Sequence, residues 1–189
     1  VHYFDVMSGI DTGAFDMRIR IIRDMAARLR DEPGPANRHA LRTLRDLTDL
    51  LAIYTGGGRG PDRHQPYLDY MLAGRQAQPL VCDITPSYAT LSRTEYADMA
   101  TVGQARFLFI LRDPVARMWS QIRMATDARK LPPGDFADGC REHAERLLES
   151  GRLPRVRRAD YARTIAELEA VVPADRIMYV FYEDLFRQE

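Results

Sequence analysis

The segment RFLFILRDPVARMWSQ, residues 106–121, places an arginine, an aspartate and a serine after an apolar run. Arg112 follows the predicted strand, and Asp113-Pro114 is typical of the start of a helix. A guanidinium beside the free N–H groups of a helix N-terminus suits a phosphate. Ser120 lies about 9 Å further along the helix axis, so it would meet only an anion lying against the helix side. For Arg112, a surface pair with Asp113 is an equal alternative on this pattern alone. For Ser120, a plain helix-surface serine is the favoured alternative.

A second polar group follows the apolar run PLVCDI, residues 79–84, which predicts a buried strand. Pro86 favours an extended Thr85, so Asp83 and Thr85 are expected to project from one side of the strand end. Asp83 is the candidate catalytic residue, because a carboxylate there could accept a proton or a hydroxyl hydrogen bond. For Thr85, capping of the turn is the favoured alternative.

Apolar runs and helical stripes alternate along much of the chain. Such alternation predicts an α/β fold with a parallel sheet, whose ligands bind beyond the carboxyl ends of the strands. Glu183 or Asp184, after the last strand, is expected to cap the next helix. Ser92 and Glu95 have the spacing of a capping box, which predicts a helix start there. The predicted strands are 2–4, 79–84, 106–111 and 176–182, and the other predicted helices are 17–31, 38–54, 66–74, 114–128, 136–150 and 160–172.

Composition excludes several classes of function. The 189 residues carry a net charge of zero, so no overall field attracts nucleic acid or an anionic membrane. No apolar run is long enough to span a bilayer, and the first residues lack the layout of a signal peptide. Two cysteines and four scattered histidines predict neither a disulfide framework nor a metal site. We therefore expect a cytoplasmic protein without a metal, and the sequence does not predict its oligomeric state.

Four segments in order, VHYFD, DITPSYATL, RFLFILRDPVARMWSQ and DYARTIAELEAVVPADRIMYVFYEDL, resemble sulfotransferases that use 3′-phosphoadenosine 5′-phosphosulfate. The likeness is to the carbohydrate and heparan-sulfate branch and its bacterial relatives. It implies a P-loop-NTPase-like, three-layer α/β domain with a central parallel sheet. Residues 1–189 would form a single such domain, truncated at both ends, with residues 17–75 as a mainly helical excursion.

The resemblance also implies site residues. Arg112 and Ser120 would bind the 3′-phosphate of the nucleotide donor, which leaves as adenosine 3′,5′-bisphosphate. His2, Thr85 and Tyr88 are the candidates for the acceptor side. The acceptor would be a hydroxyl or amine on a sugar, lipid or small metabolite, and no metal is implied.

The chain departs from the family pattern at the catalytic groups. The lysine of the family's glycine-rich loop and its catalytic glutamate are expected to lie before Val1, and Ile84 stands where many relatives have lysine. Lys130 is the only lysine of the sequence and is poorly placed to replace them. A catalytically incomplete nucleotide-binding domain of the same fold is therefore the main alternative. A kinase of this fold is least favoured, because it needs a lysine in the glycine-rich loop.

Overall fold

The fold is mixed α/β and mostly helical, with one small parallel sheet of two strands. The chain divides into two compact units, residues 1–91 (unit 1) and residues 92–189 (unit 2). The prediction of one domain over the whole chain stays a prediction. The computed structural model describes residues 2–9, 12–31, 38–56, 60, 62–150 and 157–186.

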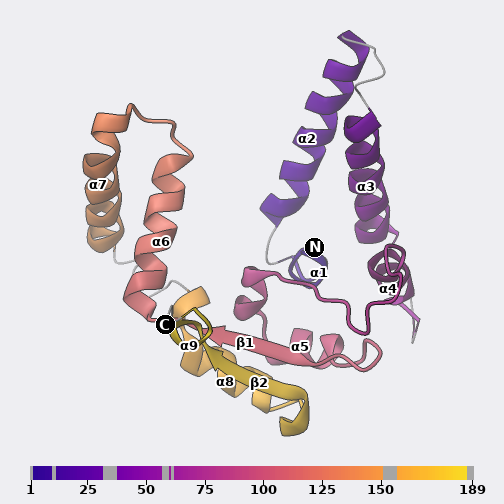
Figure 1. Ribbon diagram of the computed structural model, residues 1–189. Coiled ribbons are helices and arrows are strands. Elements are labelled where there is room, and N and C mark those ends of the chain that lie inside the picture. Colours follow the sequence, from indigo (N-terminus) through magenta and orange to yellow (C-terminus); the bar gives the residue numbers. More distant parts are fainter. Residues whose placement is uncertain are drawn as a thin grey trace. The chain divides into compact units, whose positions relative to one another are not determined.

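Unit 1 is helical throughout its regular structure (Figure 1). The sequence predictions of helices at 17–31, 38–54 and 66–74 are confirmed by α2, α3 and α4. Helices α2 and α3 pack against each other through their apolar stripes. The elements of unit 1 are α1 (Tyr3–Met7), α2 (Thr12–Asp31), α3 (Arg38–Thr55), α4 (Gln65–Leu72) and the short 3-10 helix η2 (Pro86–Thr90).

The core of unit 1 is aromatic. Tyr3 is 2% exposed and stacks on Tyr67 of α4, with 4.3 Å between the ring centroids. Phe4 packs edge-on against Tyr67 and Tyr88, at 5.6 and 5.8 Å. Such contacts tie α1, α4 and η2 together, because aromatic pairs add geometric preference to the burial of their large apolar area.

Two strands predicted in unit 1 are wrong. Residues 2–4 lead into helix α1 instead of a strand, and the free N–H groups of its first turn are satisfied by side chains. The Tyr3 N–H donates to the Tyr88 hydroxyl at 3.1 Å. Residues 79–84 form no strand, and Leu80 and Ile84 are 76% and 86% exposed. A strand needs a neighbour to bond its backbone, and the only ladder among the described residues lies in unit 2.

Unit 2 holds the two strands, which are parallel neighbours. The predictions of strands at 106–111 and 176–182, and of the helices between and around them, are confirmed. The capping box is confirmed too, since the Ser92 N–H donates to Glu95 Oε2 at 2.6 Å. The elements are α5 (Arg93–Met99), β1 (Phe107–Leu111), α6 (Pro114–Asp127), η3 (Pro133–Asp135), α7 (Phe136–Glu149), η5 (Arg157–Ala159), α8 (Tyr161–Glu169), η6 (Ala174–Arg176), β2 (Ile177–Phe181) and α9 (Tyr182–Leu185).

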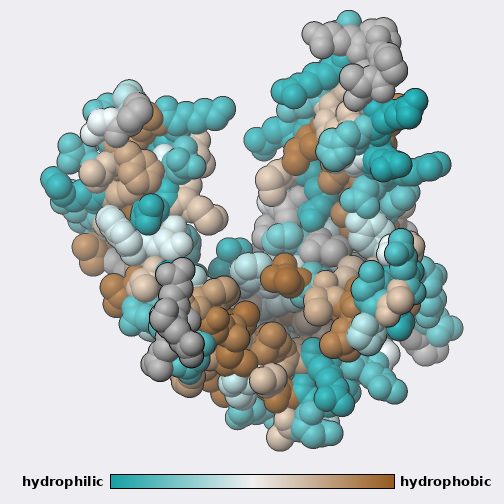
Figure 2. Space-filling view, in the orientation of Figure 1, coloured by the Kyte–Doolittle hydropathy of each residue, from teal (hydrophilic) through white to brown (hydrophobic). Residues whose placement is uncertain are grey.

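The sheet is covered on one face among the described residues. Phe107 and Phe109 of β1 contact Tyr96 and Tyr161, at 6.4 and 5.7 Å between ring centroids. The alternate residues Leu108, Ile110 and Met178 are exposed, and Figure 2 shows hydrophobic side chains gathered over the strands. The prediction that these strands are fully buried is therefore wrong for one of their faces. The larger central sheet that the sequence predicts is not formed by the described residues.

Candidate functional site

The carboxyl ends of β1 and β2 bring the arginine of the Arg-Asp-Pro segment beside a tyrosine. Leu111 pairs with Phe181 in the parallel register, so the residues that follow each strand emerge side by side. The Arg112 guanidinium accordingly lies over the Tyr182 ring, 4.5 Å from its centroid. A guanidinium in this position is held by the negative face of the ring while its N–H groups remain able to bind an anion.

Helix α6 begins directly after this arginine. Asp113 is the N-cap residue, and its Oδ1 accepts the Ala116 N–H at 2.7 Å. Pro114 occupies the first helical turn, as the sequence predicts. Within the described part of the chain Arg112 makes no ion pair. The Arg–Asp surface pair that was the alternative interpretation is therefore not what the structure contains.

A cavity of about 340 Å³ opens at this end of the sheet, which is within the size range of small-ligand pockets. Its apolar wall comes from β1, α6, α8 and β2 and includes the ring of Tyr161, and the charged residues that line it are Arg112, Asp113 and Glu183. A cation beside apolar surface suits a ligand that is anionic at one point and apolar at another. Ser120 is exposed on α6 and is not among the residues that line the cavity.

Glu183 also lines the cavity and does not cap a helix through its side chain. The first residue of α9 is Tyr182, with Phe181 at the cap position, so Glu183 and Asp184 lie inside the helix. The prediction of a cap at either residue is therefore wrong. Glu183 Oε1 instead accepts the Asp113 N–H at 3.1 Å, across 70 residues of sequence. Sequence reasoning missed this role, because nothing local to residues 182–185 indicates a contact with the other strand.

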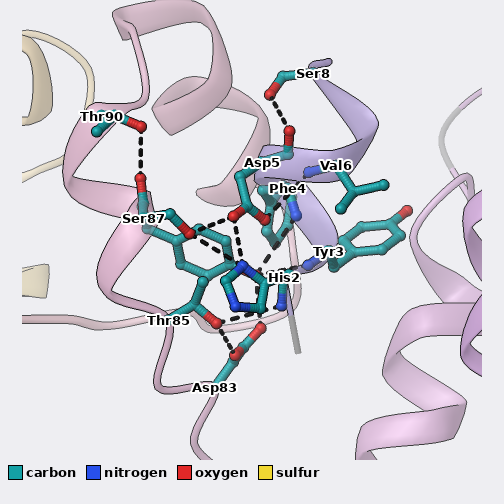
Figure 3. A network of polar contacts seen from close by, with 11 residues as sticks. His2, Tyr3, Phe4, Asp5, Val6, Ser8, Asp83, Thr85, Ser87 and Thr90 are labelled. Carbon is teal, nitrogen blue, oxygen red and sulfur yellow. Dashed lines mark hydrogen bonds and ion pairs between the residues drawn. The ribbon is translucent and has the colours of Figure 1, made fainter. Parts of the chain in front are cut away.

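In unit 1 the catalytic candidate Asp83 and the three acceptor-side candidates His2, Thr85 and Tyr88 lie in one network of polar contacts. Figure 3 shows His2, Thr85 and Asp83 within it. Asp83 accepts hydrogen bonds from the hydroxyls of Thr85, Tyr88 and Tyr67, at 2.7, 2.7 and 2.9 Å. The His2 N–H donates to Thr85 Oγ1 at 3.3 Å. The sequence prediction that Asp83 and Thr85 face the same side agrees with their contact, although no strand carries them.

Three hydroxyl donors favour the ionised form of the Asp83 carboxyl group. Burial, followed by the charge of Asp83, raises the pKa of Tyr67 and of Tyr88 well above the ordinary value, so both remain hydroxyl donors. A carboxylate bonded in this way is a stable anchor and a weak proton acceptor. The catalytic role of Asp83 stays a prediction, and the geometry favours a role in holding η2 and α4 together.

Asp5 and Ser87 complete the network and were not predicted. Asp5 is fully buried, accepts the Val6 N–H at 3.1 Å and the Ser87 hydroxyl, and its Oδ2 lies 2.7 Å from His2 Nδ1. Ser87 Oγ lies 3.1 Å from that same nitrogen. A serine–histidine–aspartate relay needs the serine and the carboxylate on opposite ring nitrogens. The arrangement therefore orients the His2 ring and is not a serine-nucleophile site.

The left-handed backbone of His2, with φ of 63°, also belongs to this network. Residues other than glycine adopt this conformation at a cost, which surrounding contacts must offset. The contact of Asp5 with the His2 ring and the hydrogen bond from the His2 backbone N–H to Thr85 supply such an offset. The signal in the sequence was the spacing of His2 and Asp5, which puts both on one face of a short helix.

We expect the stability of unit 1 to fall in mild acid because of His64. Its ring accepts from Arg63 Nε at 3.2 Å and lies 3.1 Å from the Tyr3 hydroxyl. Burial and then the Arg63 charge lower the pKa of His64, so folding favours the neutral ring. That contribution is complete above the ordinary histidine pKa of about 6.5 and is lost as pH falls through the lower folded value.

The measurement is the urea concentration at the midpoint of unfolding, at pH 7.5 and at pH 5. The near-ultraviolet circular dichroism of the tyrosines is the signal that reports unfolding. The His64→Gln variant keeps a donor and an acceptor but does not titrate, so its midpoint should fall less between the two values. Parallel pH profiles for the two proteins would show that His64 is not responsible.

Comparison with known proteins supplies no relative. A scan against protein-family models and searches of curated proteins and of solved structures found no match. Among the described residues, no cluster of three or more histidine, cysteine, aspartate or glutamate side chains could hold a metal ion. None of the described helices is both long enough and apolar enough to cross a membrane.

Proposed function

We propose that the chain is a sulfotransferase domain whose unit 2 binds the 3′-phosphate of 3′-phosphoadenosine 5′-phosphosulfate through Arg112. One observation carries the proposal: the guanidinium stands at the carboxyl end of β1, beside the start of α6, without an acidic partner in the described residues. A phosphate placed there would receive charge-assisted hydrogen bonds from a rigid fork. The order of the four sequence segments supports the same class of enzyme.

The finer fold assignment belongs to this proposal. A P-loop-like, three-layer domain with a central parallel sheet contains parallel strands followed by helices. The two parallel strands, with a helix that starts at the tip of β1, agree with a part of such a domain. The cavity at the strand ends is where ligands bind in such sheets. Ser120, two turns into α6, would meet the phosphate from the side of the helix.

Sulfuryl transfer to a hydroxyl or amine also needs a group that removes the acceptor's proton. In unit 1, His2 is the better candidate for that work than Asp83. Its ring is oriented by the buried Asp5 carboxylate, and its side chain is 30% exposed. Asp83 is already bonded to three hydroxyls, and with Thr85 and Tyr88 it would shape the acceptor side. The acceptor class proposed is a sugar, lipid or small-metabolite hydroxyl or amine.

A nucleotide-binding domain without catalysis is the second candidate, and the scarcity of lysine favours it. Lys130 is the only lysine and does not line the cavity. Ile84, at the position where many sulfotransferases of the proposed family have lysine, is 86% exposed. Transfer chemistry needs cations on the transferring group and on the leaving phosphate, which arginine would have to provide.

The first test is a calorimetric titration of the chain with adenosine 3′,5′-bisphosphate and, separately, with adenosine 5′-phosphate. We expect the bisphosphate to bind at least about tenfold more tightly, since only it carries the group that Arg112 would bind. Equal affinity for the two nucleotides would overturn the proposal. Transfer of label from radiolabelled donor to a mixture of sugars and phenols would then exclude the binding-only candidate.

A further inference from the structure

We propose that Tyr182 and Glu183 are positioning residues, which hold Arg112 and the turn after it in the geometry that receives an anion. The inference rests on the proposed function, since it takes the anion to be the 3′-phosphate of the nucleotide. It assigns to the β2 tip a role in specificity that the local sequence of residues 182–185 does not indicate.

The register of the sheet is the first step. Every residue of β1 pairs in parallel with one of β2, and the last pair is Leu111 with Phe181. The next residues, Arg112 and Tyr182, therefore leave the sheet at the same level and on neighbouring paths. The distance of 4.5 Å between the Arg112 guanidinium and the Tyr182 ring centroid is therefore a consequence of the strand pairing.

The tyrosine ring limits where the guanidinium can go. Arginine has a long, flexible stem, and ordering it on a ligand costs side-chain entropy. A ring held under the guanidinium reduces that cost before the ligand arrives. Tyr182 is itself half-buried, and the Phe186 ring lies 4.6 Å from it, so the tyrosine ring has a second aromatic contact that limits its movement. A ring, and not a hydroxyl, is what this role requires.

Glu183 holds the backbone of the same turn. Its Oε1 accepts the Asp113 N–H at 3.1 Å, and Asp113 in turn accepts the Ala116 N–H. The two bonds join the β2 tip, the β1 tip and the first turn of α6 in one chain of contacts. Since Arg112 immediately precedes Asp113, the bond from Glu183 restrains the direction in which Arg112 leaves the strand.

The experiment measures the ratio of affinities for adenosine 3′,5′-bisphosphate and adenosine 5′-phosphate in four variants of the full chain. Tyr182→Leu should lower the affinity for the bisphosphate about tenfold, while the affinity for adenosine 5′-phosphate should change less than about twofold. Tyr182→Phe keeps the ring and should retain the wild-type ratio. Glu183→Gln keeps an acceptor and should lose less than about threefold, and Asp184→Asn is the control for a neighbouring charge.

A second readout does not depend on nucleotide binding. In the free protein, the Arg112 side-chain protons should be shifted upfield by the Tyr182 ring in the nuclear magnetic resonance spectrum. Arg112→Ala identifies the signals. The shift should persist in Tyr182→Phe and disappear in Tyr182→Leu, and circular dichroism checks that each variant is folded.

The two readouts separate the outcomes. A wild-type preference for the bisphosphate that survives intact in folded Tyr182→Leu would overturn the positioning role and leave the proposed function standing. If the wild type shows no preference, the proposed function fails, and the upfield shift then decides whether the ring holds Arg112. An unshifted Arg112 in the wild type overturns the inference in either case.

Discussion

Replacing Arg112 by alanine should lower the affinity for adenosine 3′,5′-bisphosphate about 10- to 100-fold. The affinity for adenosine 5′-phosphate should stay within about twofold of the wild-type value. The range corresponds to the loss of hydrogen bonds to a charged group, about 1.5–3 kcal/mol. Arg112 borders the cavity at the strand ends, and its guanidinium rests only on the Tyr182 ring among the described residues. Little of the fold depends on it, so the variant should fold.

Isothermal titration of the variant with both nucleotides is the measurement. Arg123→Ala is the matched control, because Arg123 is an exposed arginine of the same helix, α6, away from its first turn. Arg112→Lys should recover part of the preference, since it restores the charge but not the planar fork. If the control weakens the bisphosphate as much as Arg112→Ala does, the effect is a general loss of positive charge and not a specific contact.

Replacing Asp5 by alanine should destabilise unit 1 by about 2–4 kcal/mol. The carboxylate is fully buried, and it accepts bonds from the Val6 backbone and the Ser87 hydroxyl and contacts His2 Nδ1. Its removal leaves the Ser87 hydroxyl, which is 2% exposed, without its main acceptor and opens a small polar cavity. Desolvated groups without partners account for most large single-residue losses of stability.

The free energy of unfolding follows from urea denaturation, monitored by the near-ultraviolet circular dichroism of the tyrosines, which lie in both units. Asp24→Ala is the control, because Asp24 is an exposed aspartate of α2 in the same unit, and it should change stability by less than about 0.5 kcal/mol. A loss for Asp5→Ala no larger than that of the control would mean that the buried network contributes little.

Local patterns in the sequence predict most of the helices and both observed strands. The stripes of α2 and α3, the capping box at Ser92 and the Asp113-Pro114 start of α6 are signals within a few residues, and each forms where it is predicted. Such features depend on backbone capping and on side-chain periodicity, which a short segment carries regardless of its neighbours. The placement of Arg112 at a strand tip is predictable for the same reason.

Strand formation and side-chain pairing depend on residues distant in the chain. Residues 79–84 have the apolar composition of a strand but no ladder partner among the described residues, so they form no strand, and all of them except Asp83 are exposed. Residues 2–4 become the start of a helix because the Tyr88 hydroxyl of η2 receives the N–H groups of Tyr3 and Phe4. A propensity for strand has no effect until another strand bonds to it.

The candidate site shows the same division. The types of residue at Arg112 and Asp83 indicate anion binding and proton transfer, and the sequence alone is enough to identify both residues. The contacts that set their chemistry join positions far apart: Tyr182 lies under Arg112, and Ser87 meets Asp5 across 82 residues. Only folding brings such groups within hydrogen-bond distance, and burial then determines whether a carboxylate serves as an anchor or as a base.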